Sequence, residues 1–266
     1  MNSLQIKMLI LATLPVGFLI YLFIKYKQGK MEINPYVTII KKEMSVSFHT
    51  FFKWRKKHHQ EEMSAFFYHK KSNYFWMFLA LLHEQILEMA FFHIYLKEEA
   101  PILASVMLVL HIYSVFYIIG EYNLIRNSPI LISQDKVSMK IGVRRDLTFH
   151  MKDIGYIQAA EIKYDSKGSM IHEKGVFHAT AFPRTLTRIF GISDEANYDI
   201  FFNKPLQARG YFGQFQEVHK ARVYLDQPAE FLETLQQKLE DYHSQPETEE
   251  VIVPKEPPLL LKIADS

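Results

Sequence analysis

The chain divides into an apolar first half and an alternating second half. The first half holds three apolar runs, each long enough to cross the roughly 30 Å hydrocarbon core of a bilayer as a helix. These runs cover residues 8–24, 74–96 and 101–120. The first run is followed by Lys27 and Lys30 and not by a small-residue cleavage site, which favours a retained anchor over a signal peptide. The pattern predicts a multi-pass membrane domain over residues 1–125.

Beyond residue 126, short runs in which apolar and polar residues alternate predict strands. The predicted strands cover residues 129–133, 136–141, 147–151, 154–162, 175–182, 198–202, 206–213 and 218–225. A helix follows, in which Asp226 can form the cap, Pro228 lies in the first turn, and Phe231 and Leu235 share one face. Roughly seven strands and one helix describe a small, partly open barrel closed at one end by the helix.

The order of these elements resembles the bacterial pleckstrin-homology-like (bPH) domain. The stretch ILISQDKVSMKIG and the later LTFHMKDIGYI are similar to that family's opening strands and turn, with Asp153 and Ile154 at its Asp-Ile position. The stretch from NYDIFFNKPLQARG to ARVYLDQPAEFLETLQQKL is similar to the closing strands and helix. The resemblance covers about residues 126–242, while 162–175 and 184–196 depart from the compact pattern. It implies a membrane-tethered scaffold or sensing domain. Together with the three apolar runs, it predicts an α+β membrane protein, in which three transmembrane helices precede a PH-like, partly open β-barrel with a C-terminal helix.

The distribution of charge predicts the orientation in the cell membrane. Residues 25–73 carry eleven Lys and Arg and four Glu, a net charge of +7, and short basic loops stay in the cytoplasm. The second and third spans then form a hairpin with an outer turn near Glu98. The N-terminus is therefore expected outside, and the β domain is expected in the cytoplasm.

The basic loop over residues 25–73 is also rich in aromatic and apolar residues, which predicts a helix lying in the bilayer interface. Basic residues there gain about 1 kcal/mol each from anionic headgroups. The candidates for such contacts are Lys53, Arg55, Lys56 and Lys57. Nucleic-acid binding through the same charges is the weaker alternative, and we expect no nucleic-acid partner.

A second group of headgroup candidates lies in the first hairpin of the β domain, at Lys140, Arg144 and Arg145. Lipid-binding PH domains carry a basic cluster there, but Asp146 follows directly and residues 126–242 hold sixteen Lys and Arg against fifteen Asp and Glu. The balance favours a solvated hairpin tip over contact with the membrane surface, and both over specific phosphoinositide recognition.

Ionisable residues within the predicted spans are candidates for function, because charge inside a bilayer is costly. The candidates are His83, Glu84, Glu88 and His111, while His93 of the second span falls on the opposite side of its helix from Glu84 and Glu88. With the hairpin turn near residue 98, Glu84 and His111 are expected to approach each other near mid-bilayer. Such a pair is either a structural hydrogen bond or part of a proton or metal site. The sequence HEQILE lacks the second His of the zinc motif HExxH, and the chain has no cysteine. We therefore predict no catalytic residue, cofactor or metal ligand.

Residues 243–266 form an acidic, Pro-containing tail that is expected to be flexible. Its apolar patch, Leu259–Leu261 with Ile263, favours a docking segment over simple disorder. The preferred function is a non-enzymatic membrane protein whose β domain binds lipid, a membrane-protein partner or a second copy. The alternative is an intramembrane metal- or proton-dependent enzyme or transport component centred on Glu84 and His111.

Overall fold

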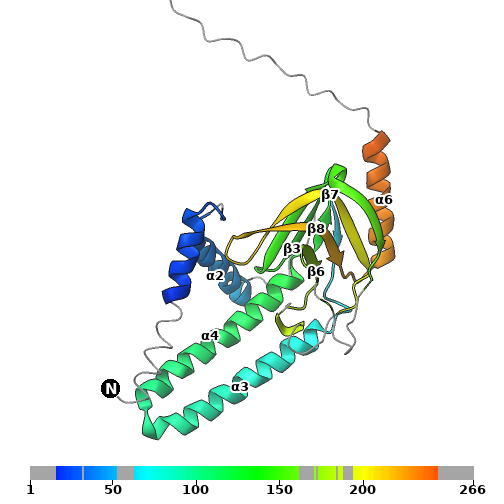
Figure 1. Cartoon of the computed structure of the whole chain (residues 1–266). Helices are drawn as coiled ribbons and strands as arrows, with labels where there is room; N and C mark the ends of the chain where they lie inside the picture. The colour runs from blue at the N-terminus through cyan, green and yellow to red at the C-terminus, as the bar shows by residue number, and fades with distance from the viewer. Residues whose placement is uncertain are drawn as a thin grey trace, which may run out of the picture.

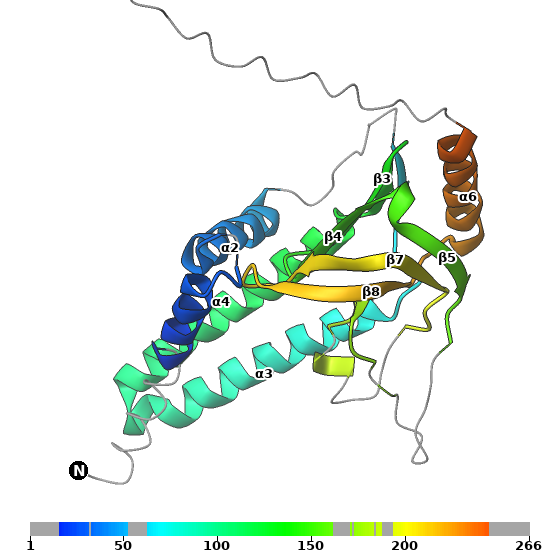
Figure 2. The ribbon, with the colours of Figure 1, turned by 45° about the horizontal axis from the view of Figure 1, so that its top comes forward.

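The structure is a computed structural model that describes residues 16–31, 33–52, 63–161, 171, 173–183, 185–187 and 194–244. Two long helices, α3 (Tyr74–Glu99) and α4 (Pro101–Arg126), run side by side away from a curled half-barrel sheet (Figures 1 and 2). Helix α2 (Pro35–Phe51) lies along α4, and α6 (Pro228–Ser244) lies against the far side of the sheet. The chain is therefore α+β, as predicted.

Helices α3 and α4 form the predicted hairpin. The chain turns at Ala100, and Pro101 starts α4, where its missing N–H leaves no bond unmade. Among the described residues, these two helices are long and apolar enough to cross a membrane, and almost none of their apolar windows is buried. They coincide with the second and third predicted spans. Residues 16–24 of the first run are helical, while residues 8–15 lie outside the described part, so the first of the three spans stays a prediction.

Helix α2 approaches α4 closely at Gly120. A Cβ atom at position 120 would lie 2.5 Å from the Val46 carbonyl oxygen and would also overlap the Thr50 hydroxyl, so glycine is required at this contact. The Thr50 hydroxyl donates a hydrogen bond to the Phe116 carbonyl at 2.9 Å. Helix α2 is thus fixed against the second half of α4 by packing and by a hydrogen bond.

The sheet has the order β1-β2-β3-β4-β7-β8-β6, with β5 paired to β7. Its strands are β1 Ser64–Phe66, β2 Ile130–Ile132, β3 Lys136–Ile141, β4 Arg145–His150, β5 Ile154–Ala159, β6 Val176–Ala179, β7 Tyr198–Arg209 and β8 Phe215–Val223. Neighbours pair antiparallel except β6 and β8, which are parallel. The 3₁₀ turn η1 (Met151–Asp153) joins β4 to β5, and the Asp153 carboxylate accepts a hydrogen bond from the His150 N–H at 3.1 Å.

One face of the curled sheet is filled by apolar side chains and covered by α6. Phe231 and Leu235 of α6 are completely buried, and the Phe231 ring meets Phe66 of β1 edge to face at 5.2 Å. Strand β1 precedes the helical hairpin in the chain, yet it pairs with β2 in this sheet. Residues 64–68, which the sequence analysis placed in the interfacial loop, therefore contribute to the β-domain core.

Two further predictions about this domain were wrong in detail. The two strands predicted at 198–202 and 206–213 are one strand, β7, because an irregularity between Phe201 and Leu206 accommodates Pro205 without ending the ladder. Asp226 does not cap α6. Its carboxylate accepts hydrogen bonds from the backbone N–H groups of His69, Lys70 and Lys71 at 2.8–3.2 Å. Asp226 thus positions the segment that enters α3.

Candidate functional site at the junction of the helices and the sheet

The β domain meets the helices at two places, and the first is the tip of the β7–β8 hairpin. Figure 2 shows this tip reaching toward α2 and α4. Backbone pairing extends the contact to the segment before α2, where the Phe215 N–H donates to the Lys30 carbonyl and Met31 bridges to Gln214. The Phe212 ring also meets Phe18 edge to face at 5.2 Å. The tip is therefore fixed on several elements at once.

Polar side chains at this tip form a network that we call the tip clamp, made of Lys42, Glu43, Tyr113, Tyr117 and Tyr211. The Glu43 carboxylate accepts hydrogen bonds from the hydroxyls of Tyr113 at 2.5 Å and Tyr211 at 3.1 Å. The hydroxyls of Tyr117 and Tyr211 lie 3.2 Å apart. One carboxylate of α2 thus joins α4 to the β domain.

The Lys42 ammonium completes the tip clamp from the same helix turn. It donates to the carbonyl oxygens of Val143 at 2.6 Å and Gly210 at 3.2 Å and lies 4.9 Å from the centre of the Tyr211 ring. Burial lowers the pKa of Lys42 to about 8, although the Asp146 carboxylate raises it in part. Backbone carbonyls and an aromatic face thereby replace water around a partly buried cation.

A partly buried ion pair reinforces the same junction. Arg144 Nε lies 2.8 Å from a Glu121 carboxylate oxygen, and Arg144 also donates to the Ala181 carbonyl at 2.6 Å. Burial acts to lower the pKa of Arg144, but the Glu121 carboxylate outweighs it and the net shift is upward. The Arg144 side chain is only 15% exposed and its charge is paired, so Arg144 links α4 to the sheet and does not present its charge to headgroups as predicted.

The remaining headgroup candidates divide between the surface and the undescribed part of the chain. Lys140 is exposed on β3, and Arg145 lies over the Phe177 ring at 5.7 Å. Lys53, Arg55, Lys56 and Lys57 lie outside the described residues. A role for these six positions in binding anionic lipid stays a prediction.

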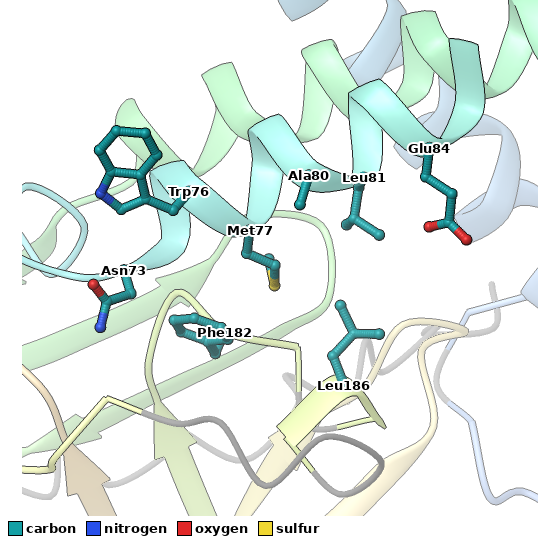
Figure 3. Close-up of a pocket in the computed structure, with 8 residues that line it drawn as sticks. All are labelled: Asn73, Trp76, Met77, Ala80, Leu81, Glu84, Phe182 and Leu186. Carbon is teal, nitrogen blue, oxygen red and sulfur yellow. The ribbon is translucent and has the colours of Figure 1, made fainter. Parts of the chain in front are cut away.

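The second meeting place of helices and sheet is a pocket of about 480 Å³ that lies between α3 and the side chains of Phe182 and Leu186. In Figure 3, Leu81 and Leu186 point toward each other across it, and Glu84 lies at the end away from Asn73. The other lining residues are Trp76, Met77, Ala80 and Phe182. The α3 residues recur at three- and four-residue spacing, which places them on one face of the helix. The pocket is thus an apolar cavity with a carboxylate at one end.

The structure does not bring the intramembrane candidates into one site. The His111 ring is buried and stacks on Phe92 at 6.0 Å, and its Nε2 atom has no hydrogen-bond partner. Within the described residues, no hydrogen bond or ion pair joins Glu84 to His111. His83 is exposed, and Glu88 accepts a hydrogen bond from Gln85 at 3.0 Å. Also within the described chain, no group of three His, Asp or Glu side chains could hold a metal ion.

The hairpin geometry explains why the expected Glu84–His111 pair is not observed. The turn lies at Ala100, so Glu84 is sixteen residues, or about 24 Å, from it, while His111 is about 16 Å from it. The two side chains therefore lie at different depths. Glu84 lies beside Leu186 of the β domain, at the end of the hairpin where the sheet begins.

A charged cluster on the sheet itself was not predicted from the sequence. Asp199 of β7 accepts hydrogen bonds from Lys220 at 3.0 Å and from Arg222 at 2.7 Å, and Lys220 also pairs with Glu173 at 2.7 Å. Asp199 and Lys220 lie on neighbouring strands, with Asp199 directly opposite Arg222. Two cations and two carboxylates balance, so the cluster stabilises the sheet and leaves no charge for an anionic ligand. In the sequence, the alternation of apolar and polar residues along 198–202 and 218–225 predicted the two strands but not the contacts between their charged residues.

A scan against protein-family models and searches of curated proteins and of solved structures found no match to this chain.

Proposed function

We propose that this chain is a non-enzymatic integral membrane protein whose PH-like β domain is an interaction module, held against the cytoplasmic surface of the cell membrane. The observation that carries the proposal is the tip clamp, in which Glu43 accepts hydrogen bonds from Tyr113 of α4 and Tyr211 of the β domain. Because this one carboxylate of α2 bonds to both α4 and the β domain, the orientation of the sheet relative to the helices is fixed. A module held in a fixed orientation presents one surface to the bilayer and another to partners.

The exposure of α3 and α4 supports the membrane assignment. Large apolar side chains such as Ile94 and Ile102 are 76% and 82% exposed, and almost none of either apolar window is buried in the protein. A core helix of a soluble protein would be mostly buried. Exposed apolar surface costs about 25 cal/mol per Å² in water, and a bilayer removes that cost.

Helix α2 supports a second contact with the bilayer. Its exposed apolar side chains fall on one face, because their spacing of three or four residues matches the helical repeat. They are Val37, Ile40, Met44, Phe48 and Phe51. The opposite face packs on α4 through Val46 and Thr50. Such a helix lies in the interface with its apolar face toward lipid, and the Lys41 ammonium can reach anionic headgroups.

The PH-like assignment of the sheet is supported by its shape and by its closing helix. The half-barrel is covered at one side by α6, and the Asp153–Ile154 step forms a tight turn before β5, as the resemblance implies. Strand β1 departs from the contiguous 126–242 unit, since it enters the sheet from ahead of the helical hairpin. This addition fastens the domain to α3 at Tyr74, whose ring packs in the β-domain core.

The orientation can be tested by labelling, because the chain has no cysteine of its own. Glu98→Cys lies at the hairpin turn, and Lys204→Cys is exposed on β7. A membrane-impermeant maleimide should label position 98 in intact cells and position 204 only after the membrane is opened. Labelling of position 204 in intact cells would place the β domain outside and overturn the proposed location.

The interaction role is tested by purifying the full-length protein from its membrane in mild detergent, with crosslinking and metal analysis of the same sample. A stoichiometric protein or lipid partner supports the module. Recovery of a stoichiometric metal that is lost in Glu84→Gln or His111→Ala would instead support intramembrane chemistry. The matched control is Glu88→Gln, which lies one turn beyond Glu84 on the same helix.

A further inference from the structure

The pocket beside α3 holds a carboxylate that the fold does not use. Within the described residues, Glu84 makes no hydrogen bond or ion pair, although it lies at the end of an apolar cavity of about 480 Å³. Pockets of this size suit a compact apolar group with a few polar contacts. We propose that the pocket binds the chain's own C-terminal segment, residues 259–263, with the Lys262 ammonium beside the Glu84 carboxylate.

The chemistry of this segment matches the lining of the pocket. Its sequence, Leu-Leu-Leu-Lys-Ile, supplies four apolar side chains and one cation, and no other Lys or Arg follows residue 255. The pocket offers apolar walls from both sides, including Met77 and Phe182, and one anion at its end. Burial of apolar surface would supply most of the affinity, and the Lys262–Glu84 pair would fix the direction in which the segment lies.

The chain is long enough to reach the pocket. Helix α6 begins two residues after Asp226, whose carboxylate bonds to the backbone of Lys71, close to Asn73 at one end of the pocket. Its seventeen residues carry Ser244 about 25 Å away. The pocket runs along α3 for about 17 Å, from Asn73 to Glu84. Lys262 lies eighteen positions beyond Ser244, and eighteen residue steps can span about 60 Å when extended, which exceeds the required path.

Attachment to the same chain favours this occupant over free ligands. A tethered segment has an effective concentration in the millimolar range, so even weak contacts fill the site. The bound tail would cover the face of α3 that lies next to the β domain. A partner that binds at this pocket must therefore displace the tail. This competition goes beyond the proposed function and does not depend on which partner the β domain binds.

Disulfide trapping tests the proposal in the full-length protein, in native membranes. Leu260→Cys is combined with Leu186→Cys, which lines the pocket. The control pair combines Leu260→Cys with Gln134→Cys, which is exposed and lies beside Lys238, Asp241 and Ser244 at the end of α6. A tail that moves at random meets position 134 at least as often as position 186. Specific docking predicts that the disulfide at 186 forms faster, by about fivefold or more.

The charge pair gives a second readout. Glu84→Lys should remove the preference for position 186, and adding Lys262→Glu to the same chain should restore it. Glu88→Lys serves as the matched control and should leave the preference unchanged. If Leu186→Cys prevents accumulation, Met77→Cys probes the same pocket.

Three results would overturn the proposal. Equal trapping at 186 and 134 would show that the tail has no preference for the pocket. A disulfide at 186 that forms only between two chains would assign the pocket to a second copy. The third result concerns labelling of Leu186→Cys with maleimide. If this cysteine stays protected from maleimide after residues 257–266 are removed, the pocket is occupied by lipid or by a partner protein.

Discussion

The β domain touches the helices on two sides, and the two contacts differ in kind. On the side of α2 and α4, hydrogen bonds and an ion pair join the helices to the β domain. They are made by the Glu43 carboxylate, the Lys42 ammonium and the Arg144–Glu121 pair. On the side of α3, Tyr74 packs in the β-domain core, but farther along the helix Leu81 and Leu186 face each other across a cavity. The first contact is closed by polar groups, and the second leaves a cavity. Substitutions on the first side should therefore affect folding, and substitutions on the second side should affect binding.

The largest effect is expected at Gly120. Gly120→Leu places a side chain where Val46 and Thr50 leave no room, and overpacking of this kind costs about 3 kcal/mol. We expect a clear drop in the midpoint of thermal unfolding of the protein purified in mild detergent. Gly17→Leu is the control, because nothing lies within 4 Å of a Cβ at that position. Equal losses at both positions would contradict the tight contact of α2 with α4.

Removal of the Arg144 guanidinium is expected to rank second. Arg144→Met leaves the Glu121 carboxylate, 19% exposed, without its cation, and breaking such a pair costs about 2–3 kcal/mol after allowance for its partial exposure. The loss should be smaller in the double variant with Glu121→Met, which removes both charges. A double-mutant cycle of unfolding midpoints measures this coupling. Additive losses would show that the pair does not couple α4 to the sheet.

Acidification should weaken the charged cluster of the sheet, which lies outside both contacts. Burial raises the pKa of Asp199, but hydrogen bonds from Arg222 and Lys220 outweigh it, so the net pKa is lowered. The hydrogen bond from Lys220 likewise lowers the pKa of Glu173. Both carboxylates therefore contribute stability at pH values above their unfolded pKa values near 4, and this contribution is lost as the pH falls through the lower folded pKa values.

The cluster should contribute about 2 kcal/mol, as is typical of hydrogen bonds between charged groups. Its test compares unfolding midpoints of wild type and Asp199→Asn between pH 7 and pH 3. The wild-type advantage should be constant down to about pH 4 and should shrink below it. An advantage that does not change with pH would show that Asp199 is not ionised in the folded protein.

A smaller effect is expected in the tip clamp. Glu43→Gln keeps the size of the side chain but weakens its hydrogen bonds with Tyr113 and Tyr211, at about 1 kcal/mol in total. The hairpin tip should then detach more often, which hydrogen exchange at residues 211–215 can measure. Exchange in α6, on the far side of the sheet, should stay unchanged. Equal acceleration in α6 would indicate global destabilisation instead of local release.

The smallest effect on the fold is expected in the pocket. Leu186→Ala removes a half-exposed side chain that faces a cavity, so its cost in unfolding free energy should stay below about 1 kcal/mol. The same change should reduce trapping of the C-terminal segment at Met77→Cys. A large loss of stability would show that the α3 side is a packed contact and would remove the contrast between the two sides.

The sequence by itself determined the elements whose signals are local. The spacing of apolar residues predicted strand β3 at its observed bounds, and Pro228 marked the first residue of α6. Length and hydropathy predicted the two helices of the hairpin. These signals are readable because each depends on neighbouring residues in the chain, through the strand or helix repeat and the fixed φ of proline.

Only the tertiary structure decided which distant residues meet. Strand β1 is three residues long and carries no distinct pattern, so its pairing with β2 across the whole helical hairpin was not predictable. Asp226 has the sequence context of a helix cap, but its carboxylate instead satisfies three backbone N–H groups near residue 70. No local pattern around Lys42 and Glu43 indicates their contact with the hairpin tip more than 160 residues later, which partly buries them. Long-range pairing of this kind depends on the summed packing of the fold, which no local pattern records.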